Sequence, residues 1–232
     1  MSDPLAADDG PNGPRSPLEL LEVMAREEVV INEDLRHLEI YTMRGLLTIL
    51  WHGPVDAERV VVMSGGGMGG LLGPAGGLYH DLGVRFAERG IGTIRVGYRK
   101  ANDLVRCVHD VAAAADLASR AGGERFVTVG HSFGGAVAVQ AGMVLGQHCA
   151  GVVTLSTQSA GCEDASMLGE NVPVLLLHGD RDEILPPDTS AVVRVLIGHG
   201  ELEILPGAGH LLSEAADHLR SRLSDWIPTQ LG

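Results

Sequence analysis

The chain has 232 residues, 45% of them hydrophobic but only 3% aromatic, so Val, Leu, Ile and Ala must build the core of one large domain or two small ones. The formal net charge of −13 argues against nucleic acid and anionic membrane surfaces as partners, because both need clustered Lys and Arg. Three scattered cysteines without C-x-x-C spacing exclude a disulfide framework and indicate reduced thiols in a cytoplasmic protein.

The first 17 residues differ in composition from the rest of the chain. They combine four prolines with Asp, Asn and Gly, and such a segment buries too little apolar surface to offset its chain entropy. We expect residues 1–17 to be a disordered arm and residues 18–232 to form a single domain. The N-terminus has no basic region followed by an apolar stretch, so we expect no signal peptide. No apolar run in the sequence is long enough to span a bilayer. The apolar spacing over residues 18–26 predicts a short amphipathic helix, which either covers the domain or continues the arm.

From residue 35 onward, strand and helix patterns alternate. Period-two apolar runs at residues 38–41 and 46–51, separated by a turn at Arg44-Gly45, predict a hairpin. Further strands are predicted at residues 59–63, 93–96, 126–129, 151–155, 174–177 and 202–205, and helices at about 78–89, 102–120, 135–145, 188–197 and 213–226. Regular alternation implies the α/β class, with a mostly parallel central sheet covered by helices on both faces.

One serine lies between two glycines at a predicted strand-to-helix corner, in Gly130-His131-Ser132-Phe133-Gly134. Such a turn is so tight that side chains two positions on either side of the serine would clash, so glycine is needed there. The turn leaves the serine hydroxyl exposed at the carboxyl edge of the sheet. Because glycine-rich chains contain G-x-S-x-G by chance, the interpretation depends on the flanking strand and helix. Ser132 is the predicted nucleophile.

A serine nucleophile needs a base within hydrogen-bond reach and an acid to orient that base. Two later loops supply both residue types, in the order acid and then histidine. The strand at 174–177 runs into a loop that contains Asp180 and Asp182, and the strand at 202–205 runs into a loop that ends in Gly209-His210. Each loop follows the carboxyl end of its strand, where the side chains of a parallel sheet meet.

With these three motifs, the chain resembles the α/β-hydrolase superfamily over roughly residues 35–228. Within that superfamily it is similar to the small lidless esterases and dienelactone-hydrolase-like proteins. The family's H-G-x-x-D-x-x-[VIL]-P loop is matched in register by His178, Gly179, Asp182, Leu185 and Pro186. The resemblance implies a single-domain α/β-hydrolase fold without a cap domain. It also implies a catalytic triad of Ser132, Asp182 and His210.

The resemblance further implies an oxyanion hole. In such folds the loop after the third strand supplies one backbone donor, and the residue after the nucleophile supplies the other. The usual His-Gly-x of that loop reads Ser64-Gly65-Gly66 here, so the implied donors are the N–H groups of Gly66 and Phe133. Since the usual histidine is replaced, the bracing of this loop is open, and Gly67 or Met68 are alternatives to Gly66.

The interval in which lid domains are usually inserted, residues 156–173, is too short for a multi-helix cap. We therefore expect an open site between residues 68–78 and 156–167, with pocket residues Met68, Leu71, Leu72, Ser156 and Met167. Open clefts favour small-molecule esters of short to medium acyl chain. The predicted enzyme is a carboxylesterase that needs neither a metal nor an organic cofactor, with a thioesterase or a dienelactone-type lactone hydrolase as alternatives. The physiological ester and the oligomeric state stay open.

Other acids compete for the role assigned to Asp182. Asp180 lies two residues earlier on the same loop. Glu163 and Asp164 follow the strand at 151–155, where some members of the fold carry the acid. Motif register favours Asp182.

A metal site, a dinucleotide site and a non-catalytic binding protein are the alternatives to an esterase. His131 and His178 lie in the matched motifs at positions that usually pack or bond loop backbone, and His109 lacks a second ligand cluster for a metal. Residues 65–70 also satisfy G-x-G-x-x-G, but no helix begins at that loop and the next strand does not end in an acid, which argues against a dinucleotide site. A non-catalytic binding protein on the same fold is the remaining class, and its expected signature is a damaged triad.

Overall fold

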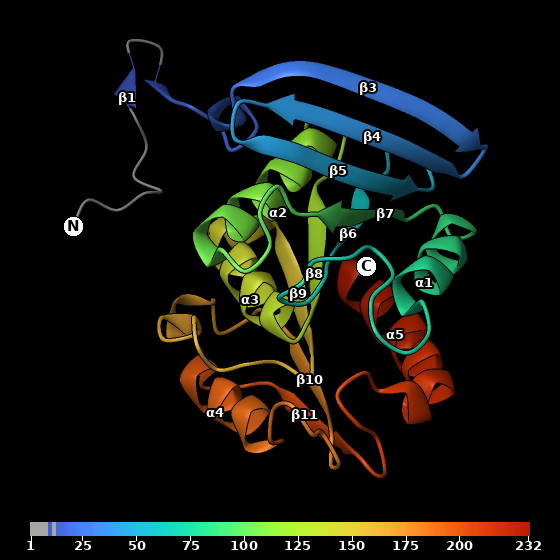
Figure 1. Cartoon of the computed structure of the whole chain (residues 1–232), viewed down its shortest axis with the longest axis vertical. Helices are drawn as coiled ribbons and strands as arrows, with labels where there is room; N and C mark the ends of the chain where they lie inside the picture. Colours follow the sequence, from blue (N-terminus) through green and yellow to red (C-terminus); the bar gives the residue numbers. More distant parts are fainter. Residues whose placement is uncertain (1–8, 11–12) are drawn as a thin grey trace.

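The strands form one nine-stranded sheet with helices packed against both faces (Figure 1). A computed structural model describes residues 9–10 and 13–232 of the chain. In spatial order the strands are β11 (Glu201–Leu205), β10 (Val174–Gly179), β9 (Cys149–Leu155), β8 (Arg125–His131), β6 (Arg59–Ser64), β7 (Gly92–Gly97), β5 (Gly45–His52), β4 (Leu35–Thr42) and β3 (Val23–Asn32). Strands β6 to β11 run parallel, whereas β5, β4 and β3 pair antiparallel at one edge. The predicted α/β class and mostly parallel sheet are confirmed.

The helices divide into two layers. Helices α1 (Leu78–Ala87) and α5 (Ala216–Leu231) cover one face, and α2 (Leu104–Ser119), α3 (Phe133–Leu145) and α4 (Asp188–Ile197) cover the other (Figure 1). Short 3₁₀ turns are η1 (Glu19–Leu21), η2 (Gly146–His148), η3 (Ala165–Met167) and η4 (Ser213–Ala215), and β1 (Asp9–Gly10) pairs with β2 (Gly13–Pro14). In the described part of the chain, no helix has both the length and the apolar character needed to cross a membrane.

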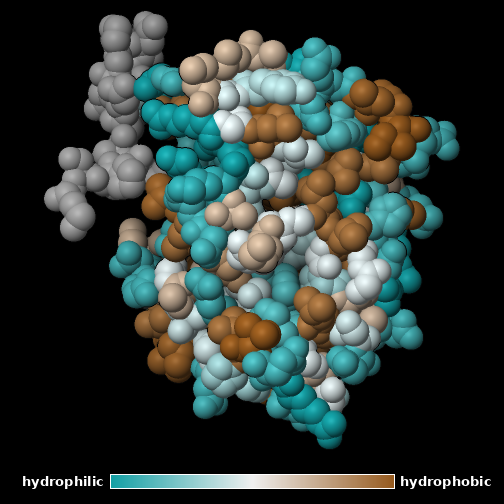
Figure 2. Space-filling view, in the orientation of Figure 1, coloured by the Kyte–Doolittle hydropathy of each residue, from teal (hydrophilic) through white to brown (hydrophobic). Residues whose placement is uncertain are grey.

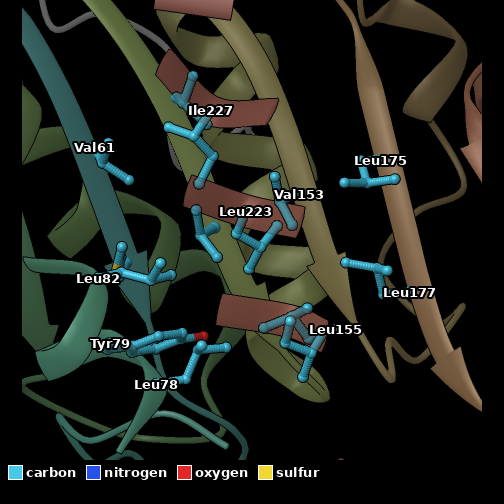
Figure 3. Close-up of a cluster of buried hydrophobic side chains, with 14 of the residues drawn as sticks. Val61, Leu78, Tyr79, Leu82, Val153, Leu155, Leu175, Leu177, Leu223 and Ile227 are labelled. Atoms are coloured by element: carbon cyan, nitrogen blue, oxygen red, sulfur yellow. The ribbon is translucent and has the colours of Figure 1, made fainter. Parts of the chain in front are cut away.

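The central strands are apolar throughout because both of their faces are covered. Successive side chains point to opposite faces, so Val61 packs toward α1 and α5, while Val62 packs toward α2 and α3. Figure 3 shows the cluster of buried side chains between the sheet and helices α1 and α5, in which Leu223 of α5 contacts Val153 of β9. On the surface seen in Figure 2, hydrophobic residues occur in separate groups among hydrophilic ones.

Helix α3 packs close to the sheet because its residues are small. A Cβ added at Gly142 would lie 2.8 Å from Cγ2 of Val152 on β9, and one added at Gly135 would collide with the Thr157 side chain. Close packing of α3 against β8 and β9 brings its N-terminus to the carboxyl edge of the sheet. The chain therefore leaves β8 and enters α3 through a single residue, Ser132.

The amino-terminal region corrects one prediction. Residues 18–26 do not form an amphipathic helix: η1 is followed directly by β3, which pairs with β4 along its length. Pairing with a neighbouring strand has overridden the local apolar spacing. Most of the predicted arm, residues 1–17, lies outside the described residues. Its final part is anchored on α2, where the Ser16 hydroxyl donates to Asp116 at 2.6 Å and the Pro17 carbonyl lies 2.8 Å from Nε2 of His109.

A buried ion pair fixes the segment between β7 and α2, which borders the site described below. Arg99 Nε lies 2.5 Å from Oδ1 of Asp110, and the Arg99 backbone N–H donates to Oδ2 at 2.8 Å. The two side chains are 3% and 0% exposed. A buried charge that loses its partner is costly, so this pair anchors the segment.

Replacing Asp110 with alanine should therefore lower the free energy of unfolding by about 3–5 kcal/mol, because Arg99 is left buried without its counter-charge. Urea unfolding monitored by circular dichroism measures the change. The control is Asp217→Ala, which removes a fully exposed partner of Arg220 and should leave the midpoint unchanged. Equal effects of the two substitutions would contradict the role of the buried pair.

Candidate active site

The nucleophile position is a strained corner between β8 and α3. Ser132 has φ 57° and ψ −119°, a conformation that costs a non-glycine residue on the order of 1–3 kcal/mol. Three backbone hydrogen bonds hold it there: its N–H donates to the Leu155 carbonyl at 2.8 Å, and its carbonyl accepts from the N–H groups of Gly135 at 3.0 Å and Gln158 at 3.4 Å. The predicted strand–turn–helix context of Ser132 is thus present.

The glycines on either side of Ser132 are required by close backbone approach. A Cβ at Gly130 would collide with the Gly134 carbonyl oxygen, and a Cβ at Gly134 would collide with the Gly65 carbonyl oxygen. The first contact closes the corner on itself. The second packs the corner directly against the loop that follows β6.

Asp182 and His210 are joined by a hydrogen bond of 2.7 Å between Oδ2 and Nδ1. The Asp182 side chain is fully buried, and its Oδ1 accepts the backbone N–H groups of Ile184 and Leu185, each at 2.8 Å. Burial by itself raises the pKa of Asp182, but these N–H donors and His210 outweigh it and hold the pKa below its usual value. Asp182 is therefore a carboxylate that orients the His210 ring, with Nδ1 protonated and Nε2 free to accept a proton.

His178 supports this acid from the opposite side. Its Nε2 lies 3.0 Å from the Leu185 carbonyl and 3.1 Å from Oδ2 of Asp182, and its Nδ1 lies 2.6 Å from the Ser190 hydroxyl. Both neighbours of Nε2 are acceptors, so Nε2 carries the proton and Nδ1 accepts from Ser190. The structural role predicted for His178 agrees with these contacts.

The acid loop and the histidine loop are fastened together by backbone contacts. Arg181 N–H donates to the Ala208 carbonyl at 3.0 Å, and a Cβ at Gly179 would collide with that same carbonyl oxygen. Asp180 accepts the Gly207 N–H at 2.6 Å, so it fastens the two loops and does not face the His210 ring. The alternative acids lie elsewhere: Glu163 accepts the N–H of Gly161, and Asp164 precedes η3.

His131, next to the nucleophile, holds the histidine loop. Its Nε2 lies 3.0 Å from the His210 carbonyl, and the two imidazole rings are 4.9 Å apart. Burial lowers the pKa of His131 to about 4, although the bond to the carbonyl opposes the shift. The ring is neutral at physiological pH, with the Nε2 proton donated to that carbonyl.

Ser132 and His210 line the same cavity, which has a volume of about 670 Å³. None of its lining residues carries a charged side chain, in contrast to the acidic protein as a whole. The lining residues are Gly65, Gly66, Gly67, Met68, Gly69, Gly70, Leu71, Leu72, Gly73, Asn102, His131, Ser132, Ile184, His210 and Leu211. The site is a neutral and largely apolar cleft.

The pocket prediction needs a partial correction. Met68, Leu71 and Leu72 line the cavity, but Ser156 and Met167 do not. The side chain of Ser156 is fully buried behind the edge of the sheet, and Met167 is 73% exposed on η3. The sequence reasoning missed three side chains that also line the cavity, those of Ile184, Leu211 and Asn102. Ile184 and Leu211 had a usable signal, since each is close in sequence to a predicted catalytic residue on the same loop.

The predicted oxyanion donors flank the nucleophile. A Cβ at Gly66 would lie 3.6 Å from Cβ of Ser132, and Phe133 is the first residue of α3. Gly67 lies beside Phe133, with its Cβ position 3.8 Å from Cβ of Phe133. The Met68 side chain is 97% exposed. The positive end of the α3 dipole also favours negative charge at this corner.

No cluster of three or more His, Cys, Asp or Glu suited to a metal ion occurs among the residues that the structure describes. His109, the metal candidate of the sequence, instead lies beside the Pro17 carbonyl and Arg99. The three cysteines are buried as free thiols.

Several known proteins resemble this chain in fold. A family model described as phospholipase/carboxylesterase matches residues 105–217. The chain is similar to Est1E from Butyrivibrio proteoclasticus (16% identity, 84% of this chain and 98% of the other, TM-score 0.67) and to a dienelactone hydrolase from Anabaena variabilis (16%, 89% and 99%, TM-score 0.71). It is also similar to an alpha-beta serine hydrolase homologue from Coxiella burnetii (19%, 84% and 98%, TM-score 0.67). No curated protein matches the chain in sequence.

The chain has the α/β-hydrolase fold. The family match covers slightly less than half of the chain and includes the positions of Ser132, Asp182 and His210. As in α/β-hydrolases generally, the chain order is serine, acid and then histidine.

The neutral state of His131 predicts a loss of stability in acid. In the unfolded chain its pKa returns to about 6.5, so below this pH the unfolded state binds a proton that the folded state binds only near pH 4. Stability is fully present above about pH 6.5 and is lost as the pH falls toward 4. The substitution His131→Asn should remove about 2–3 kcal/mol of this pH dependence. Urea unfolding of both proteins at a series of pH values measures it, and parallel curves would contradict the prediction.

Proposed function

We propose that this α/β-hydrolase is a serine hydrolase that cleaves uncharged carboxylic esters of short to medium acyl chain through an acyl-enzyme on Ser132. The observation that carries the proposal is the 2.7 Å bond between Asp182 and His210, at a cavity that Ser132 also lines. In this arrangement Ser132 is the nucleophile that attacks the bound carbonyl, His210 is its base, and Asp182 orients the base.

The reaction follows from these positions. Nε2 of His210 accepts the Ser132 proton as the hydroxyl oxygen attacks the ester carbonyl. The N–H groups of Gly66 and Phe133 stabilise the negative charge that develops on the carbonyl oxygen. His210, now positively charged and stabilised by Asp182, protonates the departing alcohol. Water then attacks the acyl-enzyme by the same route and releases the acid.

The cavity supports an uncharged substrate. Its lining offers no charged side chain to pair with an ionic group, and burying an unpaired charge would be costly. Four exposed apolar side chains surround its mouth and can contact an acyl or alkyl group: Met68, Leu72, Ile184 and Leu211. A thioester or lactone carbonyl would fit the same chemistry, and parallel assays with an acyl thioester and a lactone distinguish these substrates.

A p-nitrophenyl ester series from acetate to palmitate tests the proposal. We expect the highest kcat/KM at short to medium chains, and Ser132→Ala should lower kcat/KM by at least about 10³-fold because the nucleophile is lost. The matched control is Ser119→Ala at the end of α2, which should retain full activity with an unchanged circular dichroism spectrum. Near-normal turnover by Ser132→Ala would refute the mechanism, and a maximum at palmitate would refute the acyl range.

The acid is tested separately. Asp182→Asn should lower kcat by about 10³–10⁴-fold, because an amide no longer stabilises the charged histidine or its required tautomer. Asp180→Asn and Asp164→Asn are matched controls, and each should stay within a few-fold of wild type. A larger loss from either control than from Asp182→Asn would reassign the acid.

A further inference from the structure

The loop after β6 lacks the usual bracing histidine, and two tyrosines hold it instead. The Tyr79 hydroxyl donates to the Ser64 carbonyl at 2.9 Å, and the Tyr98 hydroxyl donates to the Gly65 carbonyl at 3.0 Å. Burial raises the pKa of both tyrosines, so both hydroxyls remain protonated donors. Two consecutive peptide groups of the loop are thus held by side chains from α1 and from the segment after β7.

The bond to Gly65 bears directly on the proposed oxyanion donor. The Gly65 carbonyl and the Gly66 N–H belong to the same planar trans peptide group and point in opposite directions. Fixing the carbonyl toward Tyr98 therefore fixes the Gly66 N–H away from it. A Cβ at Gly66 would lie 3.6 Å from Cβ of Ser132, so this peptide group lies next to the proposed nucleophile. A rotation of the group would move the Gly66 N–H relative to the developing charge.

The Tyr98 ring also contacts the other half of the oxyanion hole. It meets the Phe133 ring edge-on, with centroids 6.4 Å apart and planes at 87°. This geometry is favourable for an aromatic pair. One residue therefore touches both segments that carry the proposed donors, the loop through its hydroxyl and the start of α3 through its ring.

Tyr98 itself is well anchored. It follows the end of β7, in the centre of the sheet, and precedes Arg99, whose backbone and side chain are both bonded to buried Asp110. The Gly65 carbonyl that it holds also lies against Gly134 of the strained corner. The tyrosine, the loop and the corner form one contiguous contact.

We propose that Tyr98 is a positioning residue that aligns the two backbone donors of the oxyanion hole. This inference rests on the proposed function for its catalytic consequence. Its hydroxyl orients the Gly65–Gly66 peptide group, and its ring holds Phe133 at the matching position. Tyr98 does not touch the reacting atoms and acts through these two segments.

The test is Tyr98→Phe, which keeps the ring contact with Phe133 and removes only the hydroxyl. We expect kcat toward the best p-nitrophenyl ester to fall roughly tenfold, with KM within about twofold of wild type, because the lost bond acts on the transition state. Affinity for a trifluoromethyl ketone, which forms a tetrahedral adduct, should fall by a similar factor. The matched control is Tyr41→Phe on β4, an exposed tyrosine that bonds only Glu39 and should change neither value.

A measurement independent of turnover separates this inference from the proposed function. Amide ¹⁵N relaxation should show a lower order parameter for Gly66 in Tyr98→Phe than in wild type, with the values for α2 and α5 unchanged. An unchanged order parameter overturns the positioning role whether or not the protein hydrolyses esters. A lower order parameter with unchanged kcat and analogue affinity overturns it as well. Wild-type protein without esterase activity would refute the proposed function alone.

Discussion

The close approach of three backbone segments at Ser132 is the constraint on which the site depends. Ser132 takes up a strained conformation only because Gly130 and Gly134 leave room for the corner to close and for the Gly65 carbonyl to pack against it. The small residues of α3 add to this by letting the helix lie against β8 and β9. The serine, the start of α3 and the loop after β6 are therefore placed by one set of contacts.

The site has two electrostatic environments, a buried charge at Asp182 and an uncharged cavity. Asp182 is buried yet ionised, since backbone N–H groups and His210 compensate its charge, and His178 and neutral His131 complete the surrounding hydrogen bonds. The cavity in front of this network is lined mainly by glycine and apolar side chains, and none of its lining residues is Asp, Glu, Lys or Arg. Charge is thus confined behind the reacting position, where it orients the proposed base, while the substrate side stays neutral.

Local patterns predicted the central features well. The corner at Ser132 and the loops at Asp182 and His210 are short motifs whose backbone requirements lie within a few residues, so the sequence carries them explicitly. The errors arose where partners are distant. Residues 18–26 have helical spacing but pair as a strand with β4, and Met167 was assigned to the pocket from its position in the chain although η3 carries it to the surface.

The sequence by itself determined the alternation of strands and helices and the order of the serine, acid and histidine loops, because hydrophobic periodicity and glycine requirements are local. Only the tertiary structure decided that Asp182, and not Asp180, meets His210. It alone also decided that Ile184 and Leu211 line the cavity and that Tyr98 braces Gly65. These contacts join residues far apart in the chain, and they depend on strand register and loop packing that no single segment encodes.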